Sequence, residues 1–468
     1  MIDSILMLPA PASIPQQAPD DDKEAVKKLI SWTQKFRKDK GHLFYTPISQ
    51  QQAISTADQP ANGPVWASRT ILPAPKDDSI VTAITEAICD LDDGSCADLV
   101  VTLADVQVQW SGFRFGVGGR DKELNMSEKD KYKGLMKDTR SKATIIYAHG
   151  SGGPASVRAV TSTLAKLTKG GCLVLEQRLA PQNPFPAPLV DLLVAYLSLL
   201  YPPKDSFHEA TTPEHIIIAG ESSGGNLCLA FLLLLQHFQQ RKTRTNFHGQ
   251  CVSIPYPACF ATFCAQGDAT IPSYARNKEY DIIDDIHPTI SDIITPDSIW
   301  PSTPPRSHIY SPTTNLMTHP LVSPVSSKSW PSIKSPPLFF AYGQERMIDE
   351  GRFMSKQAFK AGASVQFHQY NALPHIFAFI AQLPQTAHLF TQWAQFCRMC
   401  VEEPQNVDSS RYYVHKPVAG TPGFKTILRD IGDGKEFTDL EYEEVLKLMD
   451  GNKTNMKVWN GPKTKSSL

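Results

Sequence analysis

The middle of the chain alternates short apolar runs with segments long enough to be helices. The runs are "TIIYAHG" at 144–150, "CLVLEQ" at 172–177, "HIIIAG" at 215–220, "CVSIPY" at 251–256, "PLFFAYG" at 337–343 and "VQFHQY" at 365–370. Such runs are typical of buried strands, and strands that alternate with helices form βαβ units. The pattern predicts an α/β fold with a mostly parallel, twisted sheet and helices on both faces.

Three further patterns lie outside this alternation. Residues 22–40 carry apolar side chains at roughly helical spacing, which predicts a helix. The stretch 99–116, "LVVTLADVQVQWSGFRFG", alternates around a Ser-Gly pair and predicts a β-hairpin. Near the C-terminus, Thr438-Asp-Leu-Glu441 has the spacing of a capping box and Gly451 that of a helix end, so we expect a helix between them.

Composition along the chain suggests its organisation. The first residues are rich in Pro, Gln and Asp, and the segment from Phe260 to Ser335 is too long for one crossover and rich in Pro, Ser, Thr and Ile. We expect a disordered N-terminus at 1–22, an N-terminal cap segment at 23–97, the core at 98–259 and 336–400, a cap or lid insertion at 260–335, and a C-terminal extension at 401–468.

Charge and composition exclude several classes of partner. The 46 basic and 47 acidic residues give a net charge of -1, and no long basic run occurs, so nucleic acid is not an expected partner. No apolar stretch reaches about 18 residues, so we expect no membrane span. The first residues lack a basic region and are interrupted by Pro9 and Pro11, which argues against a secretory signal.

The nine cysteines show no disulfide-framework spacing, which favours a reduced, cytoplasmic chain. Cys397 and Cys400 form a CxxC pair without a second pair or a nearby histidine. A buried helix face explains this pair better than a metal site does. We therefore expect neither a metal nor an organic cofactor.

The strongest chemical signal is Gly220-Glu-Ser-Ser-Gly224. It follows the apolar run 215–220 and precedes "NLCLAFLLLLQHF" at 226–238, so it predicts a strand–turn–helix elbow with Ser222 at its tip. Glycines at Gly220 and Gly224 suit so tight a turn, and the new helix directs its N-terminus at the site. Ser222 is thus the candidate nucleophile.

A serine nucleophile requires a base and an acid, which should follow later strands in the order Ser, acid, His. His375 comes just after the run 365–370 and is the candidate base, whereas His368 lies within that run and is expected to be structural. The acid should follow the run 337–343. Glu345 is nearest to the strand end and is preferred. Asp349 is the alternative, although it looks like part of the first turn of the next helix, where acidic residues are common because of the helix dipole.

Acyl transfer also needs hydrogen-bond donors for the oxyanion. The turn that begins with His149 and Gly150 follows the first strand of the series, as such a loop should. We expect the backbone N–H groups of Ser151, Gly152 and Ser223 to be the donors.

Together these motifs resemble the hormone-sensitive-lipase-like family of α/β-hydrolases. The oxyanion loop His149-Gly-Ser-Gly152, the stretch Glu176-Gln-Arg-Leu-Ala-Pro181, the elbow Gly220–Asn226 and the loop Leu373-Pro-His-Ile-Phe377 stand in the family's order over roughly residues 143–400. Three positions depart from the family pattern. Ser151 and Ile376 replace glycines, and the acid loop is one residue shorter, which places Glu345 at the acid position.

The resemblance implies an α/β-hydrolase fold with a cap, and a serine hydrolase acting on a small-molecule ester. We expect a small to medium apolar ester, a Ser222–His375–Glu345 triad and an acyl-enzyme intermediate. Two other functions stay open on the same fold: an acyltransferase or cyclase, and a non-catalytic ligand-binding receptor. The sequence gives no basis for an oligomeric state.

Overall fold

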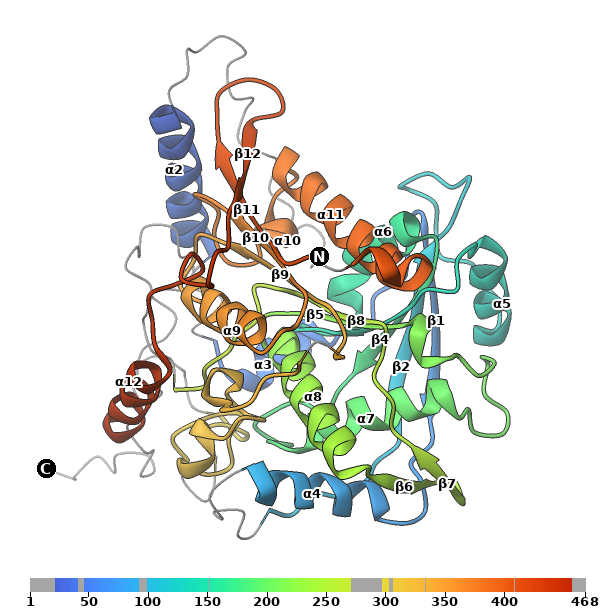
Figure 1. Ribbon diagram of the computed structural model, residues 1–468. Helices are drawn as coiled ribbons and strands as arrows, with labels where there is room; N and C mark the ends of the chain where they lie inside the picture. Colours follow the sequence, from blue (N-terminus) through green and yellow to red (C-terminus); the bar gives the residue numbers. More distant parts are fainter. Residues whose placement is uncertain are drawn as a thin grey trace, which may run out of the picture.

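The structure is a computed structural model, shown in Figure 1. It describes residues 22–40, 46–91, 99–150, 152–270, 297–302, 306–332, 334–407 and 409–456. Residues 1–21 of the expected disordered segment and residues 271–296 of the expected lid therefore lie outside the described residues, whereas Asp22 is the first residue of a helix.

A 10-stranded sheet forms the centre of the molecule, with strand order β1-β2-β4-β3-β5-β8-β9-β10-β11-β12. Its strands are β1 (Val65–Leu72), β2 (Val106–Phe113), β3 (Thr144–Ala148), β4 (Gly171–Glu176), β5 (Ile216–Glu221), β8 (Cys259–Phe263), β9 (Leu338–Gly343), β10 (Val365–Tyr370), β11 (Arg411–Pro417) and β12 (Phe424–Arg429). The strands from β4 to β11 in this order run parallel, whereas the pairs β1–β2, β2–β4 and β11–β12 are antiparallel. The predicted α/β class and mostly parallel sheet are confirmed.

Helices cover both faces of the sheet (Figure 1). They are α2 (Asp22–Lys40), α3 (Ile48–Ser55), α4 (Ser79–Leu91), α5 (Glu128–Asp138), α6 (Arg158–Thr168), α7 (Ala187–Leu200), α8 (Ser222–Arg241), α9 (Ile348–Lys360), α10 (Phe377–Ile380), α11 (Pro384–Glu402) and α12 (Tyr442–Asn455). Helices α6 and α11 pack against each other, as do α7 and α8. Every residue of α7 is buried, as are those of α8 from Gly224 to Phe238, because both helices lie between the sheet and other elements.

The register aligns the carboxyl ends of the central strands. Ala148 of β3 stands opposite Gly220 of β5, Glu221 opposite Phe263 of β8, and Gly343 of β9 opposite Tyr370 of β10. In parallel sheets the residues that follow such aligned ends converge on one crevice. The loops after β3, β5, β8, β9 and β10 therefore meet at one edge of the sheet.

The prediction of a core strand at 251–256 is wrong. Residues Gln250–Ser253 form β7, which pairs with β6 (Arg244–Phe247) in a separate two-stranded sheet. The strand beside β5 is β8, whose five residues are all buried. Pro255 and Pro257 explain the error, because proline cannot donate to a ladder and so interrupts the apolar run.

The predicted hairpin at 99–116 is also wrong. Only β2 lies in this segment, and its partner β1 comes from residues 65–72. The Ser-Gly pair lies inside β2, where a Cβ on Gly112 would stand 2.8 Å from the Leu135 side chain. Gly112 thus permits close packing of α5 and does not form a turn.

The C-terminal extension completes the sheet. β11 pairs in parallel with β10, and β12 follows it antiparallel. Helix α12 begins at Tyr442, later than predicted, and runs through Gly451 to Asn455. The predicted capping box does not form, because the Thr438 hydroxyl accepts the Leu440 N–H and Glu441 pairs with Lys356 at 2.8 Å.

The described cysteines include both free thiols and one disulfide-bonded residue. Cys89 is disulfide-bonded, so the expectation of a fully reduced chain is wrong at this position, whereas Cys172, Cys228, Cys251, Cys259, Cys264, Cys397 and Cys400 are free. No helix within the described ranges combines the length and apolarity that crossing a membrane requires.

The α2 helix matches its predicted range.

Candidate active site

Ser222 lies at the tip of a sharp turn between β5 and α8. Its φ of 53° is in the left-handed region, which is unusual for a residue with a side chain. Such a conformation at a strand-to-helix turn lifts the side chain out of the sheet. The side chain of Ser222 is partly exposed, and the next residue, Ser223, is exposed.

The turn requires glycine on both sides of the serine. A Cβ on Gly220 would lie 2.6 Å from the Ala148 carbonyl oxygen, and a Cβ on Gly224 would lie 2.1 Å from the same atom. Both distances are far below van der Waals contact, and the obstructing atom is backbone. The elbow therefore packs directly against the end of β3.

His375 and Glu345 lie next to Ser222 in a line of polar contacts. His375 Nε2 is 3.0 Å from Ser222 Oγ, and His375 Nδ1 is 3.0 Å from Glu345 Oε2. The imidazole is 2% exposed and the carboxyl group belongs to a residue that is 1% exposed. The Met347 N–H also donates to Glu345 Oε2, at 3.2 Å. The structure thus brings together the three side chains that the sequence singled out.

The two alternative residues lie elsewhere. Asp349 is in the first turn of α9 and pairs with Arg352 at 2.7 Å. His368 lies within β10 and contacts His415, with 3.0 Å between His368 Nδ1 and His415 Nε2. Ile376, which follows the candidate base, has a φ of 48°, so a branched side chain occupies a conformation that favours glycine.

The candidate oxyanion loop follows β3. Its residue Ser151 lies outside the described residues, whereas Gly152 is described. A Cβ on Gly150 would lie 3.1 Å from Ser222 Cβ, so this turn is in direct contact with the elbow. Ser223 is the second residue of α8, where backbone N–H groups lack partners within the helix.

Glu221 connects the elbow to this loop, and the sequence analysis did not single it out. Its Oε1 accepts the Gly150 N–H at 2.6 Å, and the residue is 5% exposed. Burial raises the pKa of this carboxyl to about 7, although the Tyr147 hydroxyl and the Gly150 N–H both favour its charged form. The sequence did contain a signal for Glu221, because an acidic residue inside a Gly-x-Ser-x-Gly turn between two apolar elements is expected to be buried.

His149, the first residue of the loop, is buried and acts as a structural group. Burial lowers its pKa to about 4, so the imidazole is neutral near pH 7. Gln177, the residue after β4, donates its amide Nε2 to the His149 carbonyl at 2.7 Å. A cavity of about 220 Å³ borders these two residues and is otherwise lined by Thr56, Asp105, Gln107, Glu176, Arg178 and Leu179.

The loop after β8 supports the elbow from the other side. The Gln266 N–H donates to the Ser222 carbonyl at 3.1 Å, and Asn226 Nδ2 donates to the Gln266 carbonyl at 3.1 Å. Cys264, in the same loop, is fully buried, and burial raises the pKa of its thiol well above the ordinary value. Sequence reasoning missed this loop because it follows the strand that was placed at 251–256.

One group of three residues in the described part of the chain has the composition and spacing of a metal site. The ligand atoms of Cys264, Glu345 and His375 all lie within 4.8 Å of one another. Two of these residues are the candidate base and acid, so the group overlaps the candidate active site. Cys397 and Cys400 are both free thiols on the buried face of α11.

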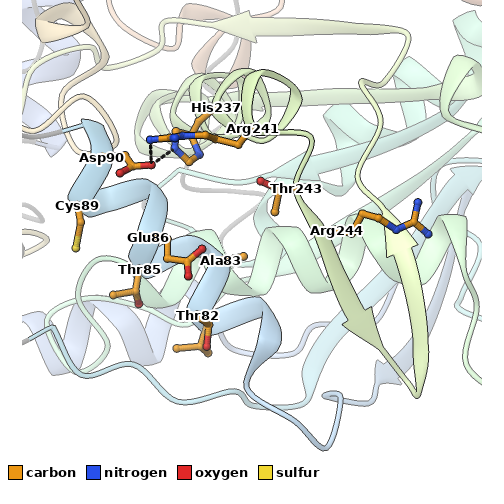
Figure 2. A pocket seen from close by; sticks show the side chains of 11 residues that line it. Thr82, Ala83, Thr85, Glu86, Cys89, Asp90, His237, Arg241, Thr243 and Arg244 are labelled. Atoms are coloured by element: carbon orange, nitrogen blue, oxygen red, sulfur yellow. Dashed lines mark hydrogen bonds and ion pairs between the residues drawn. The ribbon is translucent and has the colours of Figure 1, made fainter.

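The larger cavity in Figure 2 is separate from this site. It measures about 780 Å³ and is lined by α4 and by the C-terminal end of α8, with Arg244 on β6. Asp90 pairs there with His237 at 2.9 Å and with Arg241 at 2.8 Å. Because α8 rises about 1.5 Å per residue, His237 is roughly 20 Å along the helix from Ser222. This cavity therefore does not supply the reacting groups.

Known proteins resemble this chain over its central part. The sequence profile of the α/β hydrolase fold matches residues 145–379. An acetyl-hydrolase from Streptomyces hygroscopicus is 26% identical over 240 residues, covering 50% of this chain and 67% of that protein. Among solved structures, the hormone-sensitive-lipase homologue EstE7 from a metagenome library covers 82% of this chain and 99% of its own, with 18% identity and a TM-score of 0.48. An esterase from the bacterial hormone-sensitive lipase family covers 70% of this chain and 99% of its own, with 19% identity and a TM-score of 0.44.

Proposed function

The chain belongs to the α/β-hydrolase fold family, and we propose that it is a serine carboxylic-ester hydrolase acting on a small to medium apolar ester. The observation that carries the proposal is the pair of 3.0 Å contacts that join Ser222 Oγ, His375 and Glu345 in one line. Hydroxyl, imidazole and carboxylate in this order form a base-activated nucleophile on many unrelated folds.

The proposed acylation begins with attack of Ser222 Oγ on the ester carbonyl. His375 Nε2 takes the hydroxyl proton during the attack and then gives it to the departing alcohol. Glu345 holds the Nδ1–H of the imidazole, which keeps Nε2 as the acceptor and stabilises the imidazolium. The acyl group remains on Ser222 until a water molecule, activated by His375, releases the acid.

The negative charge of the tetrahedral intermediate falls on the carbonyl oxygen. We assign its stabilisation to the backbone N–H groups of Ser151, Gly152 and Ser223, the last at the start of α8, where the helix dipole also favours negative charge. Glu221 supports this arrangement by accepting the Gly150 N–H at 2.6 Å, which holds the loop against the elbow. None of these steps needs a metal ion or an organic cofactor.

Labelling of the purified full chain with a fluorophosphonate probe tests the nucleophile directly. We expect labelling in the native protein and in Ser223→Ala, which keeps the backbone N–H of residue 223, and none in Ser222→Ala. If Ser223→Ala lost labelling and Ser222→Ala kept it, the nucleophile would be Ser223 and the assignment to Ser222 would be wrong. A folded native protein that neither labels nor hydrolyses any ester would be a binding protein on this fold.

A series of p-nitrophenyl esters of increasing acyl length then measures the substrate range. Similarity to a protein named acetyl-hydrolase makes the acetyl ester the first member to test. We expect kcat/KM to be highest for short to medium chains. Product analysis with and without an added acceptor alcohol separates hydrolysis from acyl transfer, because a transferase would form a new ester in place of the free acid.

A further inference from the structure

Three neighbouring strands each place one metal-binding side chain at the carboxyl edge of the sheet. Cys264 follows β8, Glu345 follows β9 and His375 follows β10, and these strands are adjacent in the sheet. The sulfur, a carboxylate oxygen and an imidazole nitrogen lie within 4.8 Å of one another. The residues are 0%, 1% and 2% exposed, respectively.

The position of Cys264 is fixed by the backbone around it. Its N–H donates to the Ala341 carbonyl of β9 at 2.7 Å, and its φ of 50° turns the chain sharply at the end of β8. The next residue is also held, because the Tyr342 hydroxyl donates to the Ala265 carbonyl at 2.8 Å. The thiol is therefore held at the candidate acid and base by two contacts to β9.

Glu345 has spare coordinating capacity at this point. Its Oε2 accepts the Met347 N–H at 3.2 Å and contacts His375, but its Oε1 is buried and has no hydrogen-bond partner among the described residues. A buried oxygen without a partner is costly, which makes the group receptive to a cation. Thiolate, imidazole and carboxylate are the ligands that bind Zn²⁺, at about 2.3, 2.0–2.1 and 2.0–2.2 Å.

We propose that Cys264, Glu345 and His375 form an inhibitory site for Zn²⁺ or a similar thiophilic divalent cation. The metal binds Cys264 Sγ, a Glu345 oxygen and His375 Nδ1, and solvent supplies the fourth ligand. Coordination removes the thiol proton, which leaves to solvent. All three ligands are buried, so the cation and its water have to enter, and the proton has to leave, past Ser222, which is partly exposed.

Zinc at Nδ1 changes the tautomer of the imidazole. A neutral imidazole with its Nδ1 lone pair on the metal carries its one proton on Nε2, the nitrogen that faces Ser222 Oγ at 3.0 Å. Nε2 then cannot accept the serine proton. Metal binding and base catalysis therefore exclude each other, and this consequence, unlike the binding itself, rests on the proposed hydrolase function.

Cobalt(II) titration of the full chain tests binding without any need for activity. The Ser222→Ala variant keeps all three ligands, and we expect it to bind one equivalent of cobalt with a thiolate charge-transfer band and the visible bands of tetrahedral coordination. Added zinc should displace the cobalt. In the Ser222→Ala background, Cys264→Ser should abolish the charge-transfer band and weaken binding by about 100-fold or more.

Cys251 supplies the matched control, since it is an exposed free thiol on β7 in the separate two-stranded sheet. Cys251→Ser should leave the cobalt spectrum unchanged. Cys264→Ala, compared by near-ultraviolet circular dichroism with Cys264→Ser, checks that the loss reflects the ligand and not the fold. Absence of stoichiometric binding, or a charge-transfer band that survives Cys264→Ser, would overturn the site.

Inhibition is measured separately on the active enzyme. We expect zinc to suppress ester hydrolysis and a chelator to restore it. The half-inhibitory zinc concentration, taken relative to each variant's own activity, should rise at least about 10-fold in Cys264→Ser and remain as in the native protein in Cys251→Ser. If cobalt binds but zinc does not inhibit, the metal site exists and its proposed effect on catalysis is wrong. If the protein has no esterase activity, the proposed function is wrong, but the cobalt result still tests the metal site.

Discussion

Two buried histidines on either side of the end of β10 have opposite surroundings. His368 lies inside the strand, 0% exposed, with the rings of Phe339 and Tyr413 at 5.0 and 4.7 Å and His415 at its Nδ1. Burial, together with the neighbouring histidines, holds the pKa of His368 well below its ordinary value. His375, in the loop after the strand, instead lies between a hydroxyl and a carboxylate.

Burial beside other imidazoles keeps the His368 side chain neutral. Among the described residues, aromatic rings and other imidazoles contact His368, and none of these groups stabilises a proton on it. His375 is almost as buried, but a carboxylate on one nitrogen and a hydroxyl on the other give proton transfer a direction. The groups that contact an imidazole, more than its exposed fraction, determine whether it can transfer a proton.

Replacing each histidine by glutamine should separate their roles most strongly. We expect His375→Gln to lower kcat for ester hydrolysis by about 10⁴-fold or more, because the base is lost. His368→Gln should change kcat less than about tenfold but lower the free energy of unfolding by about 1–3 kcal/mol, because a buried contact is broken. Steady-state kinetics and urea unfolding of both variants measure this, and similar losses of kcat would contradict the contrast.

The two acidic residues after β9 provide the next test. Glu345→Gln should lower kcat by about 10²–10⁴-fold, because an amide cannot stabilise the imidazolium. Asp349→Asn, which breaks only the pair with Arg352, should change kcat by no more than a few fold. A larger loss of kcat in Asp349→Asn than in Glu345→Gln would make Asp349 the acid.

The histidines of the strand pair β10–β11 should make the fold sensitive to acid. Burial and the neighbouring His388 lower the pKa of His415 from 6.5 to about 3. The unfolded chain therefore binds a proton that the folded chain refuses, so stability is complete above pH 6.5 and is lost as the pH falls towards 3. His415 alone contributes about 4 kcal/mol to this loss.

Urea unfolding at pH 7 and pH 4.5 measures the effect. The free energy of unfolding of His415→Gln should fall less between these two pH values than that of the native protein, by about 2–3 kcal/mol. His368 and His388 also face this residue, so their own acid sensitivity remains in the variant. Equal pH dependence in both proteins would show that His415 accepts a proton without loss of packing.

Glu221 is a buried carboxyl group, and we expect it to give the free energy of unfolding the opposite pH dependence to that of His415. Its pKa is raised from 4.5 to about 7, so the folded chain holds a proton that the unfolded chain releases. Its contribution to stability is complete below pH 4.5 and is lost as the pH rises through 7, by about 3 kcal/mol at pH 8. Glu221→Gln should remove this loss, which unfolding at pH 5 and pH 8 measures, and a steeper pH dependence in the variant would contradict the assignment.

Much of the fold was readable from the sequence because its strands are continuous apolar runs. The predicted runs at 144–150, 172–177, 215–220, 337–343 and 365–370 correspond to β3, β4, β5, β9 and β10. The strands β1 and β12 were not predicted. β1 pairs with β2 across a segment that contains α4, and its residues do not form a continuous buried run. In β12 only the first of the six residues is buried, so neither strand has a local hydrophobic signal.

The sequence predicted those residues of the candidate site that follow a correctly predicted strand. Ser222, Glu345 and His375 each follow a correctly predicted strand, and the structure brings them together. Cys264 and Gln266 follow β8, which was misplaced by the prolines near residue 256, so their proximity to the elbow had no signal. The choice between Glu345 and Asp349 required distances, because one turn of chain separates the two residues.

The parallel pairing of β11 with β10 also has a consequence for synthesis of the protein on the ribosome. Between the translation of His375 and that of Arg411, β10 has no neighbour on one side, although Ser222, Glu345 and His375 have already been made. At about 5–20 residues per second this interval lasts a few seconds. During that time the nascent chain presents an open strand edge that can pair with other chains, so release of the chain before residue 411 would give a protein with all its reacting groups and a strong tendency to aggregate.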